Sequence, residues 1–151
     1  MAGIIKYLET GSVDPGYNLA FEEHVLLNRR DAPYLMLWQN DNAVVIGQNQ
    51  NTEAEVDQHF IREHGIRVVR RTTGGGAVYH DLGNLNYSFI ADAKDAGQLT
   101  MERFTLPVVD ALCSLGLDAV ASGRNDISIE GRKVSGTANE EIGRASCRER
   151  V

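Results

Sequence analysis

Residues Arg67–Phe89 read R-V-V-R-R-T-T-G-G-G-A-V-Y-H-D-L-G-N-L-N-Y-S-F, with three consecutive glycines between apolar segments. The apolar segments predict strands over 66–70, 77–79 and 86–90, with a turn over 81–84. A glycine loses more conformational freedom on folding than any other residue, so a run of glycines is costly unless the backbone must approach something closely. Bare N–H groups in such a run can face an anion or a planar ring. The run is therefore a candidate binding site.

The residues of the glycine run leave two interpretations open. The run is either a glycine-rich hairpin or bulge with a solvated basic edge, or a loop that binds a ligand. Arg70 and Arg71 lie just upstream, and in an extended segment they point to opposite faces, so that one can turn toward a ligand. The run is not a P-loop, because no Gly-Lys-Ser/Thr follows it. It also lacks the glycine spacing and the strand–helix setting of a dinucleotide-binding fingerprint.

The segment before the glycine run predicts helices among short strands. Strands are expected over 4–8, 34–38 and 43–46, and the last two are expected to pair as a hairpin because a polar turn joins them. Asp14 is the expected N-cap of a helix that runs to about residue 30. This helix carries an apolar stripe of Tyr17, Phe21 and Val25, while Glu22 and Glu23 take other faces.

Two further features of this segment are assigned to structure rather than to function. Trp38 is expected to pack in the core. A second helix is expected over 53–64, and its His59 and His64 are five residues apart, so they share no helix face and make a poor metal pair. Both histidines are therefore expected on the surface.

After the glycine run, a helix is expected over 105–116, and Cys113 within it is interpreted as a buried structural thiol. Strands are expected over 117–121, 127–129 and 132–135, and the last two form a hairpin that carries Lys133. Helices placed among hairpins, without repeated strand–helix–strand units, predict an α+β fold: a mixed or antiparallel sheet with packed helices.

Composition narrows the classes of function. A chain of 151 residues with a net charge of −6 fits one domain, and lacks the broad basic face of a general nucleic-acid-binding protein. No apolar run reaches the length of a membrane span, and no secretory signal opens the chain, so we expect no membrane partner and a cytoplasmic location. Cys113 and Cys147 indicate neither a disulfide framework nor a zinc site. Basic residues gather near the two glycine-containing motifs, which indicates a site for a small anion such as phosphate or carboxylate.

Two motifs carry a family resemblance. The run R-R-T-T-G-G-G-A-V-Y-H-D-L-G-N-L-N-Y-S-F resembles the signature of the lipoate–protein ligase A family, within the biotin/lipoate protein ligase superfamily. S-G-R-N-D-I and G-R-K-V-S-G, within 122–136, resemble that family's other signature. The similarity extends from about Asp14 to about Asn139. It implies the biotin/lipoate ligase catalytic-domain fold, which is similar to class II aminoacyl-tRNA synthetases, here in truncated form.

The end of the chain differs from the family pattern. Residues 140–151 show no apolar periodicity and hold Arg144, Arg148 and Arg150. The sequence is therefore divided into a partial catalytic domain, 1–139, and a non-matching tail, 140–151, which we interpret as not being native coding sequence.

The resemblance also implies a chemistry. Lipoate–protein ligases use ATP and Mg²⁺ to convert lipoate to lipoyl-AMP, then pass the lipoyl group to a lysine of a carrier. The carriers implied are lipoyl domains of 2-oxoacid dehydrogenase complexes or the glycine cleavage H protein. Lys133 matches the family lysine that bridges the acyl carbonyl and the α-phosphate. Considered without the resemblance, Lys133 would be interpreted as an exposed lysine of a hairpin.

Other site residues follow from the same resemblance. Those expected to contact or border ATP and the adenylate are Arg70, Arg71, Gly75, Gly76, Ala77, Val78 and Tyr79. Asp126 is expected either to associate with Mg²⁺ or to join a structural network with Arg124 and Asn125. His80 and Asn84 are expected either to act in the site or only to pin the turn.

Two alternative functions remain. An octanoyl- or lipoyl-transferase of the same fold would use a cysteine nucleophile and no ATP, and neither Cys113 nor Cys147 fits that role well. A non-catalytic lipoate-binding fragment would keep the pocket without turnover. The choice between lipoate and octanoate is not encoded in any of these motifs.

Overall fold

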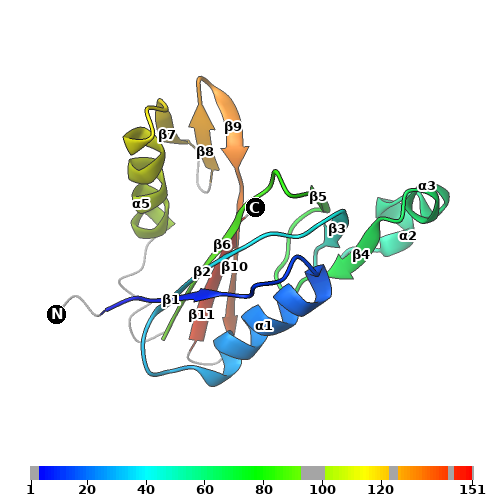
Figure 1. Cartoon of the computed structure of the whole chain (residues 1–151), viewed down its shortest axis with the longest axis horizontal. Helices are drawn as coiled ribbons and strands as arrows, with labels where there is room; N and C mark the ends of the chain where they lie inside the picture. The colour runs from blue at the N-terminus through cyan, green and yellow to red at the C-terminus, as the bar shows by residue number, and fades with distance from the viewer. Residues whose placement is uncertain (1–3, 93–100, 123–125, 143–144, 151) are drawn as a thin grey trace.

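The computed structural model describes residues 4–92, 101–122, 126–142 and 145–150. Its strands form three sheets, and helices lie beside them (Figure 1). The expected α+β class with a mixed sheet is confirmed. One of the two smaller sheets lies beside α5 (Met101–Ser114), and the other lies beside the arm that carries α2 (Thr52–Glu55) and α3 (Gln58–Glu63) (Figure 1).

The largest sheet has five strands. Its first pair of strands is parallel, and its other neighbours are antiparallel. In spatial order the strands are β1 (Lys6–Glu9), β2 (Tyr34–Trp38), β6 (Asn86–Asp92), β11 (Ala145–Arg150) and β10 (Thr137–Ile142). Residues 140–151, which show no apolar periodicity in the sequence, therefore include β11 and the end of β10 in the structure.

The second sheet positions the glycine run. Its order is β4 (Arg67–Arg70), β3 (Ala43–Ile46), β5 (Val78–His80), with β3 parallel to β4 and antiparallel to β5. The carboxyl ends of β3 and β4 therefore meet at one edge of this sheet. The predicted hairpin of 34–38 with 43–46 is wrong, because β2 and β3 belong to different sheets and each finds its partners elsewhere in the chain.

The third sheet carries the second motif. Strands β7 (Ala119–Ser122), β8 (Asp126–Ile129) and β9 (Arg132–Ser135) pair antiparallel in chain order, with a bulge opposite Ile127 and Ser128. The predicted hairpin of β8 with β9 is confirmed. Helix α5 packs against β7 and β8.

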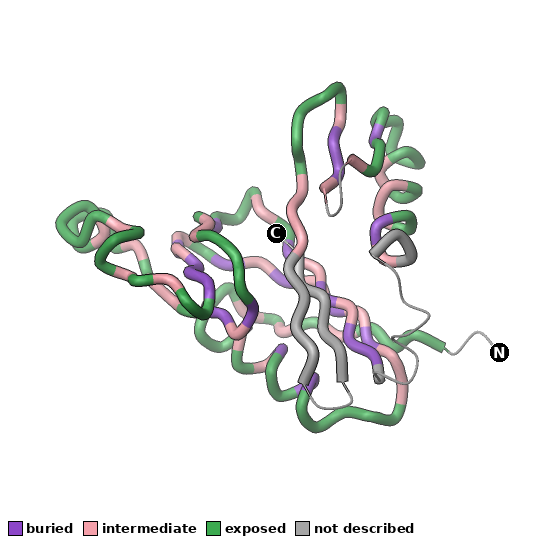
Figure 2. The backbone as a smooth tube through the Cα atoms, turned by 180° about the vertical axis from the view of Figure 1, so that it is seen from behind, coloured by how far each residue is buried: buried purple, intermediate pink, exposed green. Residues whose placement is uncertain are grey.

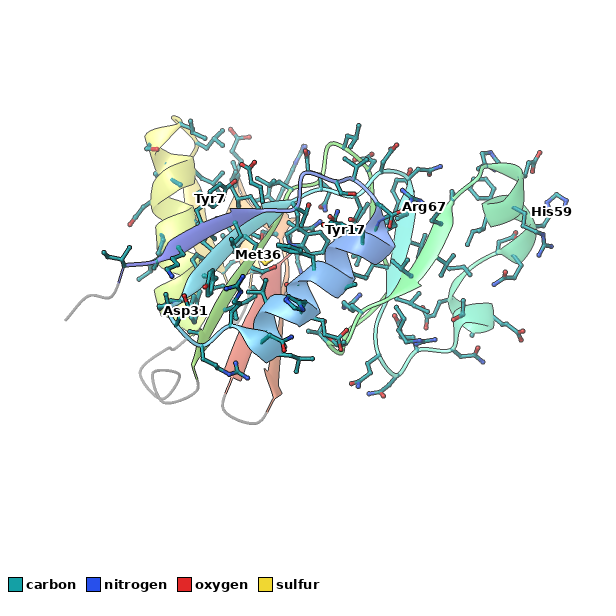
Figure 3. The ribbon with its side chains drawn as sticks, turned by 60° about the horizontal axis from the view of Figure 1, so that its bottom comes forward. Tyr7, Tyr17, Asp31, Met36, His59 and Arg67 are labelled. Atoms are coloured by element: carbon teal, nitrogen blue, oxygen red, sulfur yellow. The ribbon has the colours of Figure 1, made fainter. Side chains whose placement is uncertain are left out.

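Helix α1 (Pro15–Asn28) begins as predicted, because the Asp14 side chain accepts a hydrogen bond of 2.8 Å from the Tyr17 N–H. Arg67 forms an ion pair with the same carboxylate and lies at the N-terminal end of α1 (Figure 3). The predicted apolar stripe is confirmed at Val25, which is buried in the core, and at Phe21, which packs against the core. It is wrong at Tyr17, which is exposed, and Glu22 is buried instead.

The hydrogen bonds of Asn18 explain which face of α1 is buried. It is fully buried, and its Nδ2 donates to the carbonyls of Ser12 (3.1 Å) and Gln39 (2.8 Å) and to Asn40 Oδ1 (2.9 Å). An amide with three acceptors fixes one helix face inward, whatever the apolar pattern favours. The buried face continues through Val25 and Leu26.

The main core lies between α1 and the five-stranded sheet. Trp38 belongs to it, as predicted, and its Nε1 donates to Ser88 Oγ at 3.0 Å. Its buried members are Val25, Leu26, Tyr34, Met36, Trp38 and Ile90. Figure 2 shows buried residues along the central strands, whereas the arm with α2 and α3 is exposed or intermediate.

The predicted helix over 53–64 is wrong as a single element. Two short helices form instead, α2 (Thr52–Glu55) and α3 (Gln58–Glu63). Asp57 interrupts the helix because its side chain caps α3, accepting from the N–H groups of His59 and Phe60. His59 and His64 are exposed, as predicted, and His59 lies at the far end of this arm (Figure 3).

Cys113 is exposed, which corrects its assignment as a buried thiol. It lies near the C-terminal end of α5, and its thiol contacts the Ala119 carbonyl of β7 at 3.5 Å. No helix in the part of the chain that the structure describes is long and apolar enough to cross a membrane.

Candidate functional site

The glycine turn, residues 72–77, joins β4 to β5 and is organised by Arg71. The Arg71 side chain is buried, and its guanidinium donates to the carbonyls of Val45 (3.1 Å), Gly74 (3.0 Å) and Gly76 (2.8 Å). Gly75 adopts φ +105°, a conformation that L side chains rarely adopt. A methyl group there would also lie 2.8 Å from Arg71 Nη2. The middle glycine is therefore required by both backbone conformation and space.

The direction of the turn's N–H groups follows from these hydrogen bonds. In a trans peptide the C=O and N–H groups point in opposite directions, and no described peptide bond is cis. Because the Gly74 carbonyl faces Arg71, the Gly75 N–H points away from the guanidinium, and the Ala77 N–H does so by the same argument. Among the described residues the Gly75 N–H has no acceptor. The turn thus presents donors on an exposed surface, which suits an anion.

A second loop, residues 47–52 after β3, packs against the glycine turn. The Gln48 N–H donates to the Thr73 carbonyl at 2.9 Å. A methyl group at Gly47 would lie 2.1 Å from the Gly75 carbonyl oxygen, so the two backbones touch. Gly47 is a structural residue that was not among the predicted site residues, and its signal in the sequence is a glycine placed directly after an apolar strand. Arg70 binds this second loop rather than the glycine turn.

His80 follows the turn and is fully buried. Its Nδ1 lies 3.0 Å from Asn40 Nδ2 and 3.5 Å from Asn86 Nδ2, so the amides are the donors and the imidazole is neutral with its proton on Nε2. Burial and, to a smaller extent, the Arg71 charge lower the pKa of His80 to about 4, against an opposing effect of the Asp81 charge. Its Nε2 has no partner among the described residues.

The turn after β5 is pinned by local hydrogen bonds. Asp81 accepts from the Gly83 N–H at 2.8 Å through its side chain and from the Asn84 N–H at 3.0 Å through its carbonyl. Asn84 Nδ2 donates to Asn86 Oδ1 at 3.2 Å. Of the two roles considered for His80 and Asn84, these contacts favour that of fixing the turn.

Lys133 and Asp126 form an ion pair on the third sheet. Lys133 is paired with Ser128 across β8 and β9, and Asp126 precedes Ser128 by two residues, so all three share one face of the sheet. The Lys133 Nζ lies 3.0 Å from Asp126 Oδ2, and the two side chains are 60% and 35% exposed. This face is the one opposite to Ile127, which is fully buried. The lysine head group is therefore charged, paired and open to solvent on one side.

Two expectations for Asp126 are affected differently. Arg124 and Asn125 lie outside the described residues, so the predicted network with them stays a prediction. Among the residues that are described, no group of three or more His, Cys, Asp or Glu side chains could hold a metal ion. A magnesium ion at a nucleotide needs few protein carboxylates, because phosphates and waters complete its shell. The single carboxylate of Asp126 fits that donor set.

The remaining predicted residues border the turn. Ala77 and Val78 are half-buried, and Tyr79 is exposed with its hydroxyl donating to Asn42 Oδ1 at 3.1 Å. The structure thus brings Arg70, Arg71, Gly75 and Gly76 together at one edge of the second sheet. It places Lys133 with Asp126 on the third sheet. Asn18 and Asn40, which are buried and hydrogen-bonded in a group with His80 at the other end of β3, carried no recognisable signal in the sequence.

Comparisons with known proteins agree on one family. The profile described as "Lipoyl protein ligase A/B catalytic domain" matches residues 14–147. Lipoate-protein ligase LplJ of Bacillus subtilis is 50% identical over 128 residues, which cover 83% of this chain and 38% of that protein. Lipoate–protein ligase 1 of Staphylococcus aureus is 46% identical over 140 residues, which cover 91% of this chain and 43% of that protein. The chain spans about two fifths of the length of these relatives.

Solved structures show the same similarity. LipL1 of P. falciparum in complex with lipoate superposes with a TM-score of 0.89 at 31% identity, covering 97% of this chain and 47% of that one. The bipartite lipoate protein ligase of Thermoplasma acidophilum, solved in work on its E2 lipoyl domain, superposes with a TM-score of 0.86 at 35% identity. The match covers 99% of this chain and 60% of that one. Lipoate-protein ligase A bound with ATP superposes with a TM-score of 0.80 at 33% identity, and the match covers 99% of this chain and 66% of that one.

Proposed function

Because this chain belongs to the lipoyl protein ligase A/B catalytic-domain family, we propose that it supplies the adenylate-forming site of an ATP-dependent lipoate–protein ligase. In the first step a lipoate carboxylate oxygen attacks the α-phosphorus of ATP, an acyl–phosphate bond forms, and pyrophosphate leaves. In the second step a lysine amine of a carrier domain attacks the acyl carbon, an amide forms, and AMP leaves. The first step brings two anions together, so it needs fixed donors and positive charge.

The observation that carries this proposal is the geometry of the glycine turn. Arg71 holds the carbonyls of Gly74 and Gly76, so N–H groups of the turn face outward at the edge where β3 and β4 end. Preorganised donors of this kind stabilise a phosphate without reorganising during the reaction. We assign Gly75, Gly76 and Ala77 to the phosphate and its ester link, and Val78 and Tyr79 to apolar contact with the ligand. Arg71 adds positive charge behind the turn.

Lys133 is the residue proposed to act on the reacting atoms. Its ammonium is a compact charge on a flexible stem, and it can leave Asp126 to bridge the acyl carbonyl and the α-phosphate. The pairing with Asp126 supports a lysine whose head group is oriented until ligands arrive. Asp126 is proposed to hold Mg²⁺ together with phosphate oxygens, where the ion would neutralise charge on the leaving pyrophosphate.

The acceptor is proposed to be a lipoyl domain of a 2-oxoacid dehydrogenase complex or the glycine cleavage H protein. The Thermoplasma ligase, which was studied together with its E2 lipoyl domain, supports a carrier of this kind. The relatives solved with lipoate and with ATP support these two substrates. A reaction that consumes ATP and modifies such carriers is proposed to take place in the cytoplasm.

Pyrophosphate release tests the proposed function. Release should require both lipoate and ATP, and Lys133→Ala should reduce it on the order of a hundredfold or more, because one preorganised charge on the transition state is lost. Lys6→Ala is the matched control, since Lys6 also forms an exposed ion pair, with Asp31 at 2.5 Å, on another sheet. Full release by Lys133→Ala, or release without lipoate, would contradict the proposal.

The magnesium assignment has its own test. Asp126→Asn removes a carboxylate charge and keeps the shape of the side chain. The Mg²⁺ concentration that gives half-maximal pyrophosphate release should rise about tenfold, since one charged ligand of the ion is lost. Asp31→Asn is the control, because Asp31 pairs with Lys6 away from the site. An unchanged Mg²⁺ dependence would leave Asp126 only as the partner of Lys133.

A further inference from the structure

Arg70, the last residue of β4, donates its side-chain hydrogen bonds to the loop 47–52. Its Nη1 donates to the carbonyls of Gly47 (2.8 Å), Gln48 (3.1 Å) and Gln50 (2.8 Å). Its Nη2 donates to Thr52 Oγ1 at 3.1 Å. One guanidinium thus binds three carbonyl oxygens of the loop and the hydroxyl of Thr52, the first residue of α2. A rigid fork of donors can hold several acceptors at once, which a lysine ammonium does with less fixed geometry.

The loop that Arg70 holds is itself the support of the glycine turn. Gly47 packs backbone to backbone against Gly75, and the Gln48 N–H donates to the Thr73 carbonyl. Within the loop, the Gly47 N–H donates to Gln50 Oε1 at 2.7 Å and the Gln50 N–H donates to the Gly47 carbonyl at 3.2 Å, while Asn51 accepts from N–H groups at the start of α2. A change in the loop is therefore transmitted directly to Gly75.

The two neighbouring arginines therefore stabilise different segments of the site. Arg71 folds the glycine turn from within, through Val45, Gly74 and Gly76. Arg70 points to the other side of the chain and folds the loop against which the turn rests. The two Nη1 hydrogens of Arg70 are shared among three carbonyls, so this nitrogen has no free donor for a substrate.

We infer that Arg70 is a positioning residue that sets the ligand affinity of the site through the loop 47–52, without contacting the ligand. The expected change in KM rests on the proposed function, whereas the expected loosening of the loop 47–52 does not. Loss of Arg70 frees the carbonyls of the loop, loosens the contact of Gly47 with Gly75, and disorders the outward N–H groups of the turn. The chemistry at Lys133, on another sheet, is not altered.

Hydrogen exchange and steady-state kinetics of Arg70→Ala test this inference together. The amides of Gln48 and Gln50 should exchange on the order of tenfold faster than in the parent chain, because local opening becomes easier. The KM for lipoate or ATP should rise by about the same factor, with kcat within about threefold. Arg62→Ala is the matched control, since Arg62 is an exposed arginine whose side chain makes no hydrogen bond within the described residues.

A milder variant keeps the test decisive if Arg70→Ala does not fold. Arg70→Lys retains the charge but not the fork, so it should raise exchange at Gln48 and Gln50 and should not restore the KM. Addition of methylguanidinium to Arg70→Ala should lower the KM toward that of the parent. Unchanged exchange at Gln48 and Gln50, or a fall in kcat at constant KM, would overturn the positioning role. If the parent chain releases no pyrophosphate, the exchange result alone still decides it.

Discussion

At the scale of single residues, the environment of His80 couples the candidate site to pH. The imidazole is fully buried among Asn40 and Asn86, and Arg71 lies close enough to act on its charge. Burial lowers the pKa of His80 to about 4 from its ordinary value of 6.5. The folded chain therefore keeps His80 neutral at a pH where the unfolded chain has already protonated it.

We expect acid to destabilise the fold through this residue. Between pH 6.5 and 4 the unfolded state binds more protons at His80 than the folded state, so stability falls as pH falls through this window. The full loss is about 3.5 kcal/mol, from a pKa difference of roughly 2.5 units at about 1.4 kcal/mol per unit. Urea unfolding of the parent and of His80→Gln, at several pH values from 7 to about 4, measures it.

The slope against pH is the relevant comparison, because His80→Gln also changes stability at neutral pH. His59→Gln serves as the control, since His59 is exposed and should keep the parental slope. Equal slopes for the parent and His80→Gln would show that His80 is not the group responsible.

Single residues were also where sequence reasoning was most successful. Alternation along an extended segment predicted that Arg70 and Arg71 diverge, and their partners lie in two different loops. The start of α1 at Asp14 depends on a local cap and was predicted for the same reason. The burial of Asn18 was not predictable, because its acceptors at Gln39 and Asn40 lie far along the chain.

At the scale of elements, the two loops at the carboxyl ends of β3 and β4 form one unit. They meet because the strands are parallel neighbours, and Gly47 and Gly75 are in contact where they meet. Glycine at position 47 is required by space rather than by backbone conformation, because a methyl group there would overlap the Gly75 carbonyl oxygen. Arg71 restrains the peptide groups on either side of that carbonyl, through Gly74 and Gly76.

Gly47→Ala should therefore destabilise the chain by about 1–3 kcal/mol, as expected when an added carbon meets a backbone that must move. The same methyl placed at Gly74 meets no atom within 4 Å, so Gly74→Ala should stay within about 0.5 kcal/mol of the parent or stabilise it slightly. Chemical unfolding of the two variants measures the difference. Equal stabilities would show that the two loops do not touch as described.

Elements whose partners lie elsewhere in the chain were predicted least well. The apolar runs 34–38 and 43–46 do form strands, but their assignment to one hairpin failed because the polar turn between them carries the chain from one sheet to another. The break between α2 and α3 was missed because Asp57 caps a new helix inside a segment that otherwise fits one helical pattern. The hairpin of β8 and β9 was predicted because its signals are all local.

At the scale of the whole molecule, two motifs far apart in sequence lie on two separate small sheets (Figure 1). The five-stranded sheet connects them, and it includes β10 and β11 from the last part of the chain. The fold class followed from the order of predicted elements, whereas the division into three sheets depends on strand partners that no local pattern reveals.

The central claim, formation of an acyl-adenylate, is tested most directly by following the carboxyl oxygens of lipoate. The chain is incubated with ATP, Mg²⁺, lipoate labelled with oxygen-18 in its carboxyl group, and hydroxylamine as a general acceptor. If the carboxylate attacks the α-phosphorus and the amine then attacks the acyl carbon, one labelled oxygen stays with the phosphate. Mass spectrometry should find AMP that carries a single oxygen-18, and Lys133→Ala should form far less of it. AMP without the label, or no AMP from a chain that is folded and binds both substrates, would contradict the account.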